Sequence, residues 1–307
     1  RASGPNAPRT RRTLTVEAGF RVIGELSGLG CAAIWAGISA VMRSMSAKIS
    51  PVMVNGLRCT FGALTLSLVV LVLGRVDDIG ALPLFNAAAI ITSGMLGQGI
   101  GDAIFVRSMK VIGASRALPV ASTNPLMTLV LAVIFLGEDV TWLGVAGTLL
   151  VVGGIYLLAF PYGSFRQAGH MLSSADRGGL LLALAAGACW AVSTIVLKQG
   201  LAGVDLAVAN LLRMSTAAAL LLGMEAVHSG GRLSMGVDRR SLLIMAVAGS
   251  FSAFSSLMYV ASVHYAGAAK AAVLSATSPL FGLPLSLVFL HEKVNRRGVA
   301  GTVLAVC

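Results

Sequence analysis

The chain contains an internal repeat, and this repeat limits the folds that the chain can adopt. Residues 113–153 align without a gap on residues 267–307, and 19 of the 41 aligned positions are identical. A second correspondence, at an offset of 155 residues, covers three earlier positions: it pairs Trp35 with Trp190, Asn55 with Asn210 and Arg58 with Arg213. Because these spacings are kept over about half of the chain, they indicate a duplicated structural unit.

The composition indicates that both units lie in a membrane. Of the 307 residues, 56% are hydrophobic and 11% are charged, whereas ordinary soluble domains contain about 25% charged residues. The hydrophobic residues form runs of roughly 20, which is the length that an α-helix needs to cross a bilayer. Leu, Ala, Val and Gly dominate these runs, and in lipid each segment must satisfy its own backbone groups. The sequence therefore predicts an all-α membrane protein.

The basic charge and the cysteines limit the partners. A net charge of +11 would suggest nucleic-acid binding in a soluble protein. Here most Lys and Arg residues lie between the hydrophobic runs, so we expect contacts with anionic headgroups of the lipid bilayer and no nucleic-acid partner. The cysteines lie inside hydrophobic runs, without the spacing of metal ligands: Cys31, Cys59, Cys189 and Cys307. They predict packed thiols, and we expect no metal and no cofactor. The oligomeric state stays open.

Ten spans are expected, five in each repeat. A basic, disordered tail (1–20) precedes the first repeat (21–160), and a polar connection (161–177) leads to the second repeat (178–307). The expected spans are about 22–42, 51–74, 82–106, 113–137 and 141–160, then 178–199, 204–227, 241–263, 267–291 and 295 onward. Repeats with an odd number of spans enter the membrane from opposite faces, so we expect two inverted repeats that rock about a shared midplane site. The last span is shorter than its counterpart, and we expect it to be truncated.

Three features recur in both units and point to a family. The first helix carries a Trp (Trp35, Trp190), the second an early Arg (Arg58, Arg213), and the fourth runs from small residues through a Pro to a closing Glu, at Ala114–Glu138 and Ala268–Glu292. From about Val22 to Cys307 the chain resembles the ten-helix, EamA-like type of the drug/metabolite transporter superfamily. His291-Glu292 departs from the Gly-Glu ending that Gly137-Glu138 keeps. The resemblance implies a secondary transporter, often an exporter, of amino acids, metabolites or drug-like molecules.

The expected location is a bacterial inner membrane, with the N-terminus in the cytoplasm. The resemblance and the basic tail favour this orientation. The positive-inside rule opposes it, because the odd-numbered connections hold more Lys and Arg than the tail and the even-numbered connections together. The sequence contains no nucleotide-binding motif, so we expect transport to be secondary and the protein not to be an enzyme.

Residues that both repeats share are predicted to place helices. Arg58 and Arg213 lie about two turns into their helices, in register with Asn55 and Asn210. Each proline of the fourth helices frees a carbonyl group four residues earlier, which must face protein or a water-filled cavity. A packed kink and a cavity wall both remain possible there. The predicted structural set is Arg58, Arg213, Asn55, Asn210, Pro125, Pro279, Glu138 and Glu292.

Residues that differ between the repeats are free to bind a ligand. Gln98, Asp102 and Phe105 lie on one face of the third helix, where the other repeat has Ser252, Ser256 and Tyr259. A polar stripe can also join helices, but an acid within a span is costly unless it is paired, protonated or hydrated. Asp102 is therefore the leading candidate, with Arg107, Lys110 or Arg116 as a possible neighbouring cation. The predicted substrate-binding set is Asp102, Gln98, Phe105, Trp35, Trp190, Ser252, Ser256, Tyr259, Asn124 and Ser278.

The alternative functions are those of a membrane protein without transport activity. Gly99-Ile100-Gly101-Asp102 matches the Gly-x-Gly-Asp pattern of intramembrane aspartyl proteases. That chemistry needs two carboxyl groups that share a proton, and the other aspartates lie in connections or at the ends of spans. A scaffold role is the second alternative. Glu25, near the start of the first span, is a further acidic candidate that occurs in one repeat only.

Overall fold

The computed structural model describes residues 11–46, 48–113, 117, 120–159, 174–229, 237–278 and 280–281, and every regular element in these ranges is a helix. The first half contains α1 (Arg11–Met45), α2 (Pro51–Val72), α3 (Asp77–Gly80), α4 (Leu84–Gly94), the π-helix η1 (Met95–Gly101), α5 (Asp102–Ile112), α7 (Asn124–Leu136) and α8 (Trp142–Ala159). The second half contains α10 (Ser174–Gly200), α11 (Leu206–His228), α12 (Arg239–Ala266) and α13 (Ala268–Ala276).

Six segments of the described residues are long and apolar enough to cross a membrane. They are Gly19–Met42, Pro51–Val72, Leu84–Ile112, Asp176–Gly200, Leu206–His228 and Arg239–Tyr265. These segments coincide with the first three predicted spans of each repeat, and α4, η1 and α5 together form the third span. Large apolar side chains on their outer faces, such as Leu68, Leu181 and Val247, are more than half exposed. The protein is therefore an integral membrane protein whose helices contact lipid.

The starts of the second helices repeat in structure as well as in sequence. The side chain of Ser50 caps α2 by accepting a hydrogen bond from the Met53 N–H at 3.1 Å. At the equivalent place Asp205 caps α11, accepting from the N–H groups of Ala207 and Val208 at 2.9 and 3.2 Å. Both caps satisfy backbone donors that a helix start leaves free.

The ends of the third spans also correspond. Gly113 follows α5 with φ +79°, and Gly267 follows α12 with φ +96°. Only glycine adopts this backbone conformation without strain, so the chain turns at the same place in both repeats. The starts of α2 and α11 and the ends of α5 and α12 therefore lie at matching positions of the repeat.

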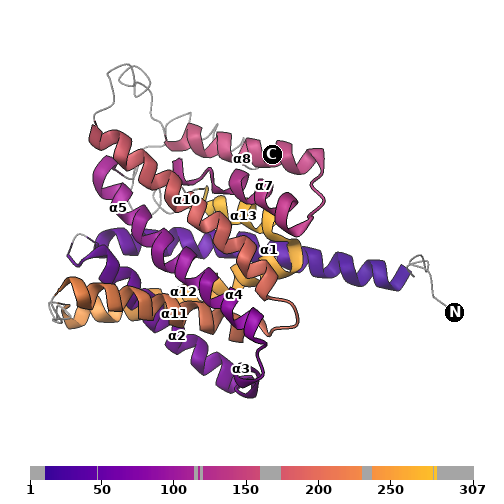
Figure 1. Ribbon diagram of the computed structural model, residues 1–307, viewed down its shortest axis with the longest axis horizontal. Helices are drawn as coiled ribbons and strands as arrows, with labels where there is room; N and C mark the ends of the chain where they lie inside the picture. The colour runs from indigo at the N-terminus through magenta and orange to yellow at the C-terminus, as the bar shows by residue number, and fades with distance from the viewer. Residues whose placement is uncertain are drawn as a thin grey trace.

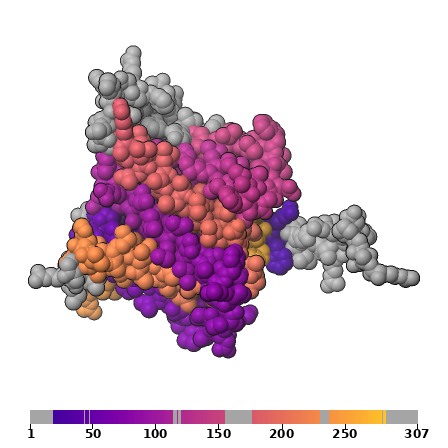
Figure 2. All heavy atoms as spheres, in the orientation of Figure 1, coloured from indigo at the N-terminus to yellow at the C-terminus, as the bar shows by residue number. Residues whose placement is uncertain are grey.

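The two halves pack against each other in a reciprocal way. The first helix of one half, α1, packs along α12, which is the third span of the other half. In the same way α10 packs along α4, η1 and α5, and the two second helices, α2 and α11, pack against each other. Figure 1 shows α1 crossing the middle of the molecule, and Figure 2 shows segments of both halves side by side on one face. The interior is thus built from both halves together.

The described structure bears on three sequence expectations. The helix α1 begins at Arg11, so residues 11–20 are helical and not part of a disordered tail. Arg11–Phe20 forms a direct extension of the first span, and no proline interrupts it. The fourth span is not one continuous helix, because the turn at Ser122-Thr123 separates α7 from the residues before it. Pro125 lies in the first turn of α7, where its missing N–H costs nothing. The ten-span count stays a prediction, since the final predicted span lies outside the described residues.

Candidate functional site

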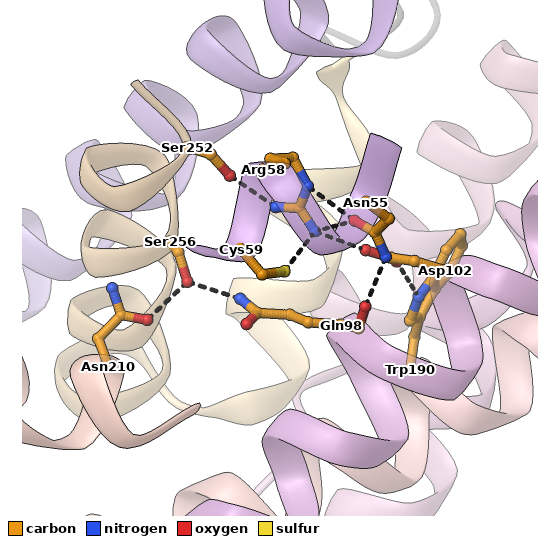
Figure 3. A network of polar contacts seen from close by, with 9 residues as sticks. All are labelled: Asn55, Arg58, Cys59, Gln98, Asp102, Trp190, Asn210, Ser252 and Ser256. Atoms are coloured by element: carbon orange, nitrogen blue, oxygen red, sulfur yellow. Dashed lines mark hydrogen bonds and ion pairs between the residues drawn. The ribbon is translucent and has the colours of Figure 1, made fainter. Parts of the chain in front are cut away.

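Polar side chains from both halves meet in the interior and form one hydrogen-bonded network (Figure 3). They come from α2, η1, α5, α10, α11 and α12. Charged and amide side chains are costly in such a place unless they bond to one another. The network therefore satisfies polar side chains from several helices at once. Its members are Asn55, Arg58, Cys59, Gln98, Asp102, Trp190, Asn210, Ser252 and Ser256.

Arg58 is the centre of the network and is only 1% exposed. Its Nη2 lies 3.0 Å from Oδ2 of Asp102 in an ion pair. Its Nη1 donates to Oγ of Ser252 at 2.6 Å, and its Nε donates to Oδ1 of Asn55 at 2.8 Å. The guanidinium carbon lies 5.2 Å from the centroid of the Trp35 ring, a cation–π contact. One arginine therefore joins α1, α2, α5 and α12.

Asp102 is held from both halves. Its second carboxylate oxygen accepts a hydrogen bond from Nε1 of Trp190 on α10 at 2.9 Å. The ring of Phe105 contacts the Trp190 ring edge-on, at 5.1 Å between centroids. Both carboxylate oxygens thus contact nitrogen donors, and the side chain is 12% exposed.

The cation beside Asp102 differs from those suggested by the sequence. Arg107 and Lys110 follow Asp102 on α5, and Arg116 lies outside the described residues. The pairing cation is Arg58, from a different helix, because α2 packs against α5 in the folded chain. An aspartyl protease would need a second carboxyl group at Asp102, whereas the described contacts are with Arg58 and Trp190.

The π-helix η1 lies between Gly94 and Asp102 and presents Gln98 to the network. The backbone carbonyl oxygen of Gln98 accepts a hydrogen bond from Nδ2 of Asn55 at 2.8 Å. The side-chain Nε2 of Gln98 donates to Oγ of Ser256 at 2.9 Å. A Cβ atom added at Gly101 would lie 2.9 Å from Nε1 of Trp190, so glycine is required for the approach of α10. Single π-helical turns within α-helices are frequent at functional sites.

The second repeat makes the same backbone contact but then differs. Nδ2 of Asn210 donates to the backbone carbonyl oxygen of Ala253 at 3.3 Å, and as in the bond from Asn55 to Gln98 the acceptor lies 43 residues after the asparagine. Oδ1 of Asn55 accepts from Arg58, whereas Oδ1 of Asn210 accepts from Ser256 at 2.6 Å. The second repeat has Ser256 where the first has Asp102, and Asn210 therefore makes different side-chain bonds from Asn55.

The other predicted residues lie around or outside this network. The Tyr259 hydroxyl is 2.6 Å from the hydroxyl of Thr194, an unpredicted residue of α10. Asn124 and Ser278 are half-buried and are not members of the network. Glu25 forms an exposed ion pair with Lys270 at 2.7 Å. Pro279 and Glu292 lie outside the described residues.

Glu138 joins the two halves at the end of the fourth span. Its Oε1 accepts from the Ala268 N–H at 2.7 Å and its Oε2 from the Ala269 N–H at 3.2 Å. A carboxylate at this place caps the first turn of α13 and interacts favourably with the helix dipole. The sequence indicates a structural glutamate but gives no sign of which helix it caps. Pro125 has a similar packed setting, because the Ala121 carbonyl oxygen four residues earlier faces Gly187 of α10.

Three comparisons relate this chain to known proteins. A protein of Archaeoglobus fulgidus named "Uncharacterized transporter" is 24% identical over 225 residues, which are 73% of this chain and 75% of that protein. A solved structure titled "Crystal structure of protein" has the same fold, with a TM-score of 0.75 and 18% identity over 93% of this chain and 94% of that one. The pattern of the EamA-like transporter family matches residues 22–160 and 177–307. These two segments cover most of the sequence, and the chain therefore belongs to the EamA-like transporter family.

Proposed function

We propose that this membrane transporter is a secondary transporter that exports small metabolites, amino acids or drug-like molecules by alternating access. The observation that carries the proposal is the buried ion pair between Arg58 and Asp102, which lies within membrane spans and is bonded to side chains of both halves. Ionisable groups inside a membrane protein mark substrate, ion or proton pathways by default. The location proposed is a bacterial inner membrane with a cytoplasmic N-terminus.

The architecture proposed is two inverted repeats of five spans each. Reciprocal packing of α1 on α12 and of α10 on the third span supports this arrangement. In such transporters the halves rock against each other around a midplane site. Three bonds of the network cross between the halves, from Arg58 to Ser252, from Gln98 to Ser256 and from Trp190 to Asp102. Rocking would exchange these bonds for bonds to substrate or water.

Asp102 is proposed to carry the coupling proton. A proton on its carboxyl group would remove the charge that attracts Arg58, and the bonds to Trp190 and Arg58 would weaken together. Deprotonation would restore the ion pair and close the network. The proton thus changes the free energy difference between the two conformations, which is what a coupled transporter requires.

The test uses the full chain reconstituted in proteoliposomes. A thermal-shift screen against amino acids, organic acids and cationic drugs identifies binding compounds, because a ligand of the folded state raises its apparent stability. Each compound found is then loaded radiolabelled into proteoliposomes, and its release is measured against protein-free liposomes. Saturable release through the protein supports a transporter. Binding of a compound with neither its release from the proteoliposomes nor its uptake into them would contradict the proposal and favour a scaffold.

A further inference from the structure

The two buried arginines at equivalent places in the repeats have different surroundings. Every nitrogen of the Arg58 guanidinium donates a hydrogen bond. Arg213 is also buried, with 3% of its surface exposed. Its Nε donates to Oγ of Ser93 at 3.2 Å, but its Nη1 is buried and has no hydrogen-bond partner among the described residues.

The repeat explains why Arg213 has no ion-pair partner among the described residues. The position that matches Asp102 is Ser256, and the Ser256 hydroxyl donates to Asn210. Among the described residues Arg213 has no ion pair, whereas Arg58 is paired with Asp102 at 3.0 Å. A buried cation is costly unless an anion or several acceptors compensate it. The second half therefore keeps a positive charge where the first half has an ion pair.

We infer that Arg213 binds the anionic group of the transported molecule, a carboxylate or a phosphate. Guanidinium groups bind both groups through two parallel hydrogen bonds, and Nη1 is a donor without a described partner for one of these bonds. Oε1 of Gln98 is a second buried atom without a described partner, and it is an acceptor available to a hydroxyl or ammonium group. This inference rests on the proposed transport function and names the substrate class.

The glycines of the third span let η1 and α4 pack closely against α11 beside Arg213. A Cβ atom added at Gly94 would collide with the backbone of α11 at Arg213. A Cβ atom added at Gly97 would lie 4.0 Å from Nη2 of Arg213. Gly97 belongs to η1, whose π-helical turn is not repeated in α12.

The experiment measures binding and does not depend on transport. The full chain in phosphatidylcholine nanodiscs is melted with succinate or inorganic phosphate, and with succinamide as the uncharged analogue, at matched ionic strength. We expect the anions, and not succinamide, to raise the melting temperature. In Arg213→Gln the apparent affinity for the effective anion should fall about tenfold or more, as expected for a lost bond to a charged group. The control Lys270→Gln removes an exposed cation and should keep the full shift.

Several results would overturn the inference. They are an unchanged anion affinity in Arg213→Gln, an equal shift with succinamide, and no shift with either anion. Stabilisation only by phosphatidylglycerol in the nanodisc would assign the anion to a lipid headgroup and would also contradict it. If Arg213→Gln does not fold, Arg213→Lys keeps the charge and loses the planar fork, so an unchanged affinity in that variant is equally contradictory. Anion binding without transport would refute the proposed function alone, and transport of uncharged compounds without anion binding would refute this inference alone.

Discussion

The ion pair between Arg58 and Asp102 predicts a strong coupling between two substitutions. Asp102→Asn keeps the shape of the side chain and leaves a cation that is 1% exposed without its anion. Removing one partner of a buried pair costs about 3–5 kcal/mol of stability. Arg58→Gln should cost less, because the remaining carboxyl group can bind a proton while a guanidinium group cannot lose one. The side chain of Asp102 is also more exposed, at 12%, than that of Arg58, at 1%.

The double variant should recover much of this loss. With Gln at position 58 and Asn at position 102, both side chains are neutral and can still bond to each other, to Ser252 and to Trp190. We expect the double variant to be more stable than the sum of the single effects by about 2 kcal/mol or more, within the range measured for residues in one network. The assay is reversible unfolding of the four proteins in mixed micelles. Additivity within about 0.5 kcal/mol would refute the reasoning, since that is the behaviour of independent sites.

Two further substitutions test how the halves are joined. Glu138→Gln should lower stability by about 0.5–2 kcal/mol through loss of the charged cap on α13, as measured by thermal unfolding, and an unchanged melting temperature would show that the cap is not needed. Gly101→Ala places a methyl group 2.9 Å from Trp190 and 3.0 Å from the Leu96 carbonyl oxygen, and should cost about 1–3 kcal/mol. Its matched control is Gly147→Ala on α8, where an added Cβ meets nothing within 4 Å; equal stability of the two variants would contradict the close approach of α10.

Much of the fold could be predicted because the hydrophobic runs and the repeat are strong signals. The apolar run that became α2 and the run that became α11 have the predicted length within a few residues. Their starts also follow from local chemistry, since Ser50 and Asp205 are good capping residues. The third span was less predictable. A glycine-rich helix and a π-helix have the same hydrophobic pattern, so η1 could not be distinguished from regular helix.

Most residues of the buried network stood out in the sequence, but their connections did not. Asp102 and Arg58 were each selected, one as a ligand-binding residue and the other as a structural one, and the structure places them in a single ion pair. They are 44 residues apart on different helices, and their contact depends on how α2 packs against α5. Ser93 and Thr194 gave no usable signal, because single hydroxyl residues are common in membrane helices.

The most direct test of the central claim is proton movement coupled to transport. Proteoliposomes that contain a pH-sensitive dye are exposed to a compound that the wild-type protein transports, with Glu25→Gln as a control that neutralises an exposed acid of α1. Wild-type protein and Glu25→Gln should move protons when the compound is added. Asp102→Asn should show no coupled proton movement, and its transport rate should not depend on pH. Wild-type proton movement and pH dependence in Asp102→Asn would contradict the account.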